Sequence, residues 1–143
     1  MDGSLYASLA AFGAFVFVLV IAIGILLIVA NWKIFTKAGQ PGWATLIPVY
    51  NVYVMSQIAF GSAVYFIALI IAWVVSFIGN ISGIDFISSL ASLAQLVLYI
   101  IYCANISKAF QKSVGFTVGL VVLPVIFFPI LGFDSSRYIG PQS

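Results

Sequence analysis

Charge is the property that this sequence most lacks. Only 6% of its 143 residues are charged, whereas 64% are hydrophobic and 16% are aromatic. Soluble domains carry about 25% charged residues, and the five basic and three acidic side chains present cannot cover a water-exposed surface of this size. The composition excludes an ordinary soluble domain. It predicts an all-α integral membrane protein that forms a single membrane domain over residues 1–143.

Histidine and glutamate are absent, and Cys103 is the only cysteine. An intrachain disulfide is therefore excluded, and a Cys/His metal site has no ligands. Cys103 lies in a strongly apolar run, where a buried and unreactive thiol is expected. We expect no catalytic site, no metal and no cofactor, so the sequence predicts a protein that is not an enzyme. A net charge of +2 spread over several turns also argues against a nucleic-acid partner.

Long apolar runs dominate what is present. Four of them, at about residues 8–32, 62–79, 86–107 and 114–133, have the length of roughly 20 residues that a helix needs to cross a bilayer core of about 30 Å. Asp2 is the only charge ahead of the first run, so no basic signal-peptide region precedes it and we expect it to remain in the protein. Pro124 and Pro129 interrupt the last run and should kink it or break it into two short arms.

The segment between the first and second runs is the most polar part of the first half. Lys33 and Lys37 end the first run, and Gly39 is predicted to be a left-handed helix C-cap. Residues 40–43, with Pro and Gly at the centre, are typical of a type II turn. Residues 43–60 then carry an uneven polar stripe, which predicts an interfacial or re-entrant helix in contact with the lipid bilayer.

Charge placement predicts the orientation of the four spans. If residues 43–60 do not cross, Lys33, Lys37, Lys108 and Lys112 share one side, with a net charge of +4. The remaining charged residues, three aspartates and Arg137, share the other side, with a net charge of −2. The excess of lysine predicts that the four act as cytoplasmic topology anchors and that both termini lie outside. A turn at the two prolines would instead return the C-terminus to the cytoplasm.

The two lysine-containing turns resemble one another. Residues 30–31 and 104–105 are both Ala-Asn, and each pair is followed by a Lys-containing turn and then by a Pro-Val pair. Asn31 and Asn105 are therefore a candidate polar pair at equivalent depths, as in transporters built from parallel repeats. The alternatives are chance similarity in a sequence of low diversity and ordinary solvation of helix ends.

The segment after Lys37 carries a distinctive motif, Gly-x-Pro-Gly-Trp followed by Ile-Pro-x-Tyr-Asn. Over about residues 25–138 the chain resembles a family of small prokaryotic multi-pass membrane proteins classified as a domain of unknown function and often labelled automatically as signal-peptidase-I-like. The resemblance implies a bacterial or archaeal inner-membrane protein and no established activity. The motif makes the following residues the candidate functional or structural turn: Gly39, Pro41, Gly42, Trp43, Pro48, Tyr50 and Asn51.

A signal peptidase resembles a Ser/Lys-dyad enzyme, whose lysine base must lie within hydrogen-bond reach of its serine. Here every lysine is predicted on the cytoplasmic side, and the opposite side has only short loops. We therefore expect a non-enzymatic accessory subunit, assembly factor, receptor or other interaction protein, with another membrane protein or a second copy as its partner. The alternatives are a small transporter or channel and, third, a protein that binds anionic lipid through its lysines.

Overall fold

The computed structural model describes residues 2–142 and is helical, with no strand among them. This confirms the all-α fold class. The elements, in chain order, are α1 (Gly3–Lys37), the 3₁₀ helix η1 (Gly42–Leu46), α2 (Pro48–Phe60), α3 (Val64–Ser82), α4 (Asp85–Ala109), α5 (Val114–Val122) and α6 (Pro124–Phe133).

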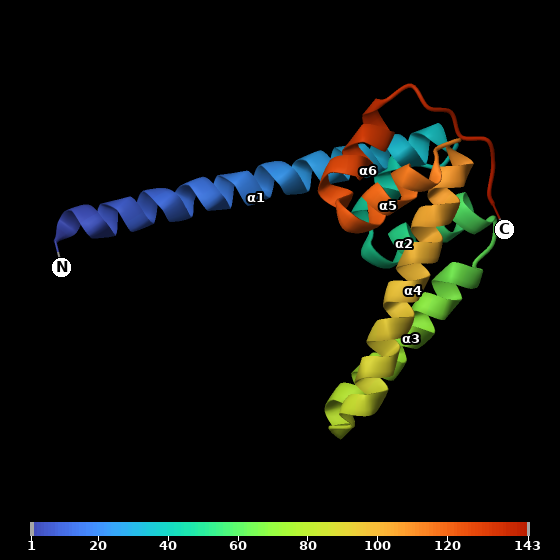
Figure 1. Cartoon of the computed structure of the whole chain (residues 1–143), viewed down its shortest axis with the longest axis horizontal. Coiled ribbons are helices and arrows are strands. Elements are labelled where there is room, and N and C mark those ends of the chain that lie inside the picture. Colours follow the sequence, from blue (N-terminus) through green and yellow to red (C-terminus); the bar gives the residue numbers. More distant parts are fainter. Residues whose placement is uncertain (1, 143) are drawn as a thin grey trace.

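Three helices, α1, α3 and α4, are long and apolar enough to cross a membrane. They correspond to the first three predicted spans, except that α3 begins two residues later than predicted. α1 has 35 residues, so it is about 52 Å long at 1.5 Å per residue. α3 and α4 form an antiparallel hairpin that leaves the rest of the molecule in a different direction from α1 (Figure 1). The three helices are consistent with a membrane protein.

The fourth predicted span is not one helix. Residues 114–133 form α5 and α6, of 9 and 10 residues, which pack against each other. Each is about 15 Å long, half of what a spanning helix needs. The break follows from Pro124, which disfavours helical geometry at the preceding residue and begins a new helix. Leu123 has φ −128° and ψ 61°, whereas Pro129 lies inside α6 without breaking it. Four spans are therefore not confirmed.

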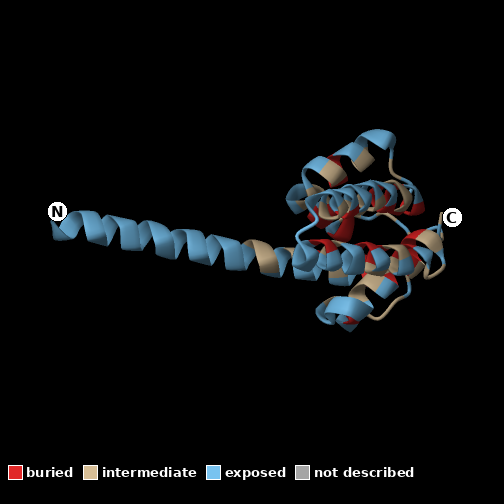
Figure 2. Ribbon diagram, turned by 90° about the horizontal axis from the view of Figure 1, so that it is seen from below, coloured by how far each residue is buried: buried red, intermediate tan, exposed pale blue. Residues whose placement is uncertain are grey.

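The short helices η1, α2, α5 and α6 pack around the C-terminal ends of α1 and α4, and together these parts form a compact cap. Buried residues gather in this cap, whereas most of α1 is exposed (Figure 2). The cap core includes Ile34, Phe35, Val54, Ile58, Tyr102, Ile106, Phe110, Leu120 and Leu131. Residues 43–60 contribute η1 and α2 to the cap, with Val54, Ser56, Ile58 and Ala59 buried. This segment is thus a packed part of the cap.

α6 crosses α1 at a point where only glycine fits. A Cβ atom on Gly132 would lie 2.6 Å from the carbonyl oxygen of Ala30, and Ala30 itself is fully buried. The obstacle is backbone, which cannot rotate away as a flexible side chain can. The contact fixes how closely the α5–α6 hairpin approaches α1.

We expect Gly132→Ala to lower the free energy of unfolding by about 1–3 kcal/mol, because the added methyl pushes α6 off α1. Thermal unfolding in mild detergent, followed by reaction of a thiol dye with the buried Cys103, measures the change. Gly24→Ala is the matched control, since a Cβ there meets nothing within 4 Å and alanine is the better helix former. Equal stabilities for the two variants would contradict the assigned crossing.

Candidate functional site

The most polar site in the cap is a cluster of two lysines and one aspartate. Lys37 Nζ lies 3.0 Å from Asp134 Oδ1, and Lys112 Nζ lies 2.6 Å from Asp134 Oδ2. Lys37 ends α1, Lys112 lies in the turn between α4 and α5, and Asp134 directly follows α6. The three side chains are only 20–25% exposed. The cluster joins three parts of the chain that are distant in sequence.

Lys37 also caps helix α6. Its ammonium group donates to the carbonyl oxygens of Leu131, at 2.6 Å, and of Asp134, at 2.8 Å. The last carbonyls of a helix have no partner within the helix and carry its partial negative charge. The Lys37 ammonium group therefore bonds two carbonyl oxygens at the end of α6 and one oxygen of the Asp134 carboxylate.

The carboxylate of Asp134 is held in its charged form. Partial burial raises the pKa of Asp134, but hydrogen bonds from Lys112, Ser136 and Lys37 outweigh this and hold the pKa well below the ordinary value for aspartate. Ser136 donates to Asp134 Oδ1 from both its backbone N–H and its hydroxyl. Both oxygens of the Asp134 carboxylate therefore accept hydrogen bonds from residues of the cap.

The cluster corrects one part of the predicted topology. Asp134 was expected on the opposite side of the membrane from Lys37 and Lys112, and this expectation is wrong because the aspartate contacts both lysines. The α5–α6 hairpin returns the chain to the end of α1. The charge asymmetry could not indicate on which side the C-terminal tail lies, because the charges of Asp134 and Arg137 cancel on either side.

The C-terminal tail crosses the cap as an extended strap. Tyr138 donates its hydroxyl to the carbonyl of Ile58 at 2.6 Å, Ile139 donates its backbone N–H to Ala109 O at 2.8 Å, and Gln142 donates its own to Ala59 O at 3.0 Å. Ile58 and Ala59 lie in the last turn of α2, and Ala109 ends α4, so these bonds satisfy carbonyls that a helix leaves unpaired. Burial raises the pKa of Tyr138, which keeps its hydroxyl a donor.

Asn31 and Asn105 bond to different parts of the chain. Asn105 Nδ2 donates to the carbonyl of Gln142 in the strap at 2.7 Å, whereas Asn31 Nδ2 bonds Leu27 O in its own helix at 3.0 Å. The two side chains therefore have different partners, and their place as a polar pair at equivalent depths stays a prediction. The two lysine turns nevertheless end their helices in the same way, with a positive φ at Gly39 and at Gln111.

The predicted turn around residues 39–43 is partly as expected. Gly39 has φ +79°, and Gln40 donates to Phe35 O at 2.8 Å, which confirms the left-handed C-cap. The type II turn is wrong, because Gly42 begins η1 without the positive φ that such a turn requires. Glycine is needed there for space, since a Cβ would clash with the Trp32 indole.

The other motif residues build the joint between η1 and α2. Pro48 begins α2, and Asn51 Nδ2 donates to the carbonyl of Thr45 in η1 at 3.0 Å. Tyr50 stacks between Trp43 and Tyr53, with ring centroids 5.8 and 6.0 Å apart. The three stacked rings are partly exposed, as expected of aromatic residues at a membrane interface.

The four lysines divide into different roles. Lys37 and Lys112 form the cluster, Lys33 lies 5.3 Å from the centre of the Phe133 ring, and Lys108 is exposed. Ser136 Oγ lies 3.4 Å from Lys37 Nζ, at the edge of dyad distance. Three acceptors lie closer to Lys37 Nζ than Ser136 Oγ does, and an ammonium group has three protons to donate.

Residues 43–141 match the model of a family of unknown function, DUF5684. The protein belongs to that family. The resemblance to a family of unknown function is thereby confirmed, while no curated protein and no solved structure matches the chain. In this DUF5684 protein Lys112 and Asp134 lie inside the matched region, whereas the whole of α1, with Lys37, precedes it.

Sequence reasoning found the lysines of the cluster and missed its other members. Asp134, Ser136 and Tyr138 follow the last apolar run and looked like an ordinary polar tail. The one available signal was Pro124, which breaks that run in the middle. A chain that turns back there brings the tail to the lysines.

We expect Asp134→Asn to lower the free energy of unfolding by about 1–3 kcal/mol, because it leaves the ammonium groups of Lys37 and Lys112 without their carboxylate partner. The folded-state pKa of Asp134 is depressed, so its contribution is complete above the unfolded pKa of about 3.9 and is lost as pH falls toward the folded value. Thermal unfolding from pH 7 down to pH 3 measures this.

Between pH 7 and pH 3 the free energy of unfolding of the wild-type protein should fall. That of the Asp134→Asn variant should fall less, because the variant has no carboxylate at this position to protonate. Asp85→Asn is the matched control, since Asp85 is exposed and forms no ion pair among residues 2–142. Removing its charge from the first turn of α4 should cost at most about 1 kcal/mol. A wild-type and Asp134→Asn pair with parallel pH profiles would contradict the ion-pair assignment.

Proposed function

We propose that this protein is a non-enzymatic interaction subunit of a membrane complex, with α1 as the helix that packs against a partner. The observation that carries the proposal is the isolation of α1. All residues from 3 to 22 are exposed, and Ala30 is the first buried residue of the helix. Among the helices described, α1 packs against α6, η1 and α2, all near its C-terminal end (Figure 1), where Lys37 also bonds Asp134.

The sequence of α1 supports helix docking. Ala7, Ala11 and Ala14 follow one another at helical spacing, so they form a narrow stripe of small side chains on one face. Small residues let another helix backbone approach closely in a membrane, where packing drives association between helices. Large side chains such as Leu9 and Val16 occupy the opposite face, which suits contact with lipid.

The cap supports an interaction role because its polar groups are used for structure. Lys37, Lys112 and Asp134 satisfy one another, and Tyr138 and Asn105 hold the strap. A rigid cap of this kind sets the directions in which α1 and the α3–α4 hairpin leave it. The proposed function of the cap is to hold these arms in position for partner helices.

We further propose three spans in a prokaryotic inner membrane, with the N-terminus outside and the cap and C-terminal tail in the cytoplasm. The cap end then has five basic groups and Asp134, a net charge of +4, while Asp2 and Asp85 give the far end −2. This asymmetry satisfies the excess of positive charge inside as well as the four-span prediction did.

In this orientation the re-entrant element is the α5–α6 hairpin, and η1–α2 lies at the interface. Val114, Val122 and Ile126 expose apolar side chains from the hairpin, which suits contact with the inner half of the bilayer. The partly exposed Trp43 and Tyr50 suit the headgroup level.

Thiol labelling in intact cells tests the three-span topology. In a Cys103→Ala background we expect Ser4→Cys to react with a membrane-impermeant reagent from outside. Ser135→Cys, which is exposed in the tail, should react only after the membrane is permeabilised. Labelling of Ser135→Cys in intact cells would contradict the proposed position of the cap.

Photo-crosslinking from α1 tests the interaction role. A photoreactive residue at position 11, in the alanine stripe, should give a protein adduct of one discrete mass in native membranes. The same residue at position 16, on the opposite face, should give lipid adducts and serves as the control. Lipid adducts alone from both positions would overturn the proposal that α1 docks on a partner.

A small transporter or channel is the second candidate, and the observation that favours it is the helix break at Leu123. Broken helices place backbone carbonyls where solutes and ions bind in transporters. Proteoliposomes that contain the purified protein would then show solute flux above that of empty liposomes, and flux equal to that of empty liposomes would remove this candidate.

A further inference from the structure

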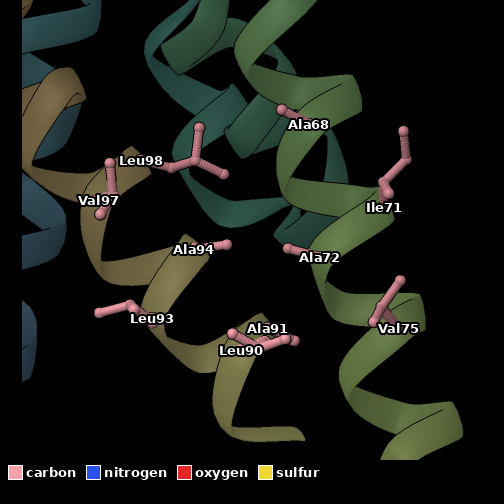
Figure 3. A pocket seen from close by; sticks show the side chains of 10 residues that line it. All are labelled: Ala68, Ile71, Ala72, Val75, Leu90, Ala91, Leu93, Ala94, Val97 and Leu98. Carbon is pink, nitrogen blue, oxygen red and sulfur yellow. The ribbon is translucent and has the colours of Figure 1, made fainter. Parts of the chain in front are cut away.

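The α3–α4 hairpin has two different faces. One carries an apolar groove of about 700 Å³, floored by small side chains that include Ala68, Ala72, Ala91 and Ala94. Figure 3 shows these alanines on the facing sides of the two helices. The other face carries a polar groove of about 500 Å³, lined mainly by Ser76, Asn80, Ser88, Ser89 and Ser92.

The polar face continues along α4. Successive residues of α4 are about 100° apart around the helix axis. Ser88, Ser92 and Gln95 therefore lie on one side of Ala91. Leu90, Ala94 and Val97 lie on its other side. Tyr99 follows Ser92 and Gln95 on the polar side and donates its hydroxyl to Leu120 O in α5 at 3.0 Å. The cap therefore covers this face near Tyr99 and leaves it open from Gln95 outward.

Gln95 lies at the centre of the proposed span. It is ten residues after Asp85, the first residue of α4, so it is about 15 Å along the helix, half of a bilayer core of about 30 Å. Its side chain makes no hydrogen bond within residues 2–142. Lipid chains offer no partner, and an amide left unpaired in hydrocarbon is costly.

The polar groups near the tip of the hairpin are also only partly paired. Ser88 donates to Asn80 Oδ1 at 2.9 Å, which leaves the amide protons of Asn80 free to bond elsewhere. Ser92 and Ser89 are exposed. Each of these side chains has both a donor and an acceptor, and none is charged.

Helix α1 cannot cover this face. No residue from Leu9 to Ala30 has a polar side chain, so α1 brings no hydrogen-bonding group to the depth of Gln95, whether from the same chain or from another. A second copy of the hairpin brings the same serines and amides at the same depths. Uncharged groups with donors and acceptors bond their own copies across a two-fold axis without repulsion.

We propose that the Ser76–Asn80–Ser92–Gln95 face of the α3–α4 hairpin is a homodimer interface. The inference rests on the proposed interaction role and names a second copy as one partner. It assigns to the hairpin a docking surface that is separate from the alanine stripe of α1, so the two can fail independently.

Disulfide crosslinking tests which face meets the second copy. In a Cys103→Ala background, Ser92→Cys should give a covalent dimer when native membranes are oxidised with copper phenanthroline. Ala94→Cys is the matched control, since it lies two residues away in the apolar groove and should stay monomeric. Crosslinking through Ala94→Cys alone, or through neither position, would overturn the proposed interface.

A substitution at Gln95 tests the chemistry of the interface. Gln95→Leu should raise the dissociation constant of the dimer about 3- to 30-fold, the range expected for one interhelical hydrogen bond. Gln95→Asn should retain most of the association, and Val97→Leu on the apolar face should leave it unchanged. Energy transfer between labelled copies in liposomes measures all three.

Thermal unfolding of the protein, diluted in detergent until it is monomeric, separates folding from association. The Gln95→Leu monomer should unfold at the wild-type temperature, because the Gln95 side chain makes no hydrogen bond to residues 2–142. A wild-type protein that is monomeric in liposomes overturns the dimer, even if α1 still crosslinks to another protein. A dimer that persists when α1 finds no partner upholds this interface and removes only the role assigned to α1.

Discussion

The ammonium group of Lys37 is the interaction on which the cap depends. It stands at the end of α1 and donates to the end of α6 and to the Asp134 carboxylate, which in turn accepts from Lys112. Three helix ends and the start of the strap therefore meet at one charged cluster. Because an isolated ammonium is costly away from water, α1 can end here only where the α5–α6 hairpin returns to meet it.

The features that could be predicted from the sequence are local ones. Apolar length identified α1, α3 and α4, because a spanning helix is a property of about 20 consecutive residues. Gly39 could be assigned as a left-handed cap because the requirement for positive φ belongs to one position. Pro124 identified a break for the same reason.

Sequence reasoning offered two directions for the chain after Pro124, across the membrane or back to the cytoplasm, and could not decide between them. The direction depends on Gly132 fitting against Ala30 and on Asp134 reaching Lys37, contacts between residues about 100 positions apart. Charge counting did not help, since the opposite signs of Asp134 and Arg137 cancel on either side. The role of Gly42 was similarly hidden, because its neighbour is the Trp32 ring and its φ is ordinary.

One polar face of α4 links the cap to the membrane. Its inner part, at Tyr99, is bonded by α5, and its outer part, at Gln95 and Ser92, has the same chemistry without a covering element. The α5–α6 hairpin is too short to reach further, because Pro124 turns it back after about 14 Å. The cap bonds the polar side chains of this face only as far as Tyr99. The side chains beyond it can find hydrogen-bond partners on a surface from outside the chain. Among residues 2–142 the same face carries such groups at that depth, which is why we propose a second copy as the partner.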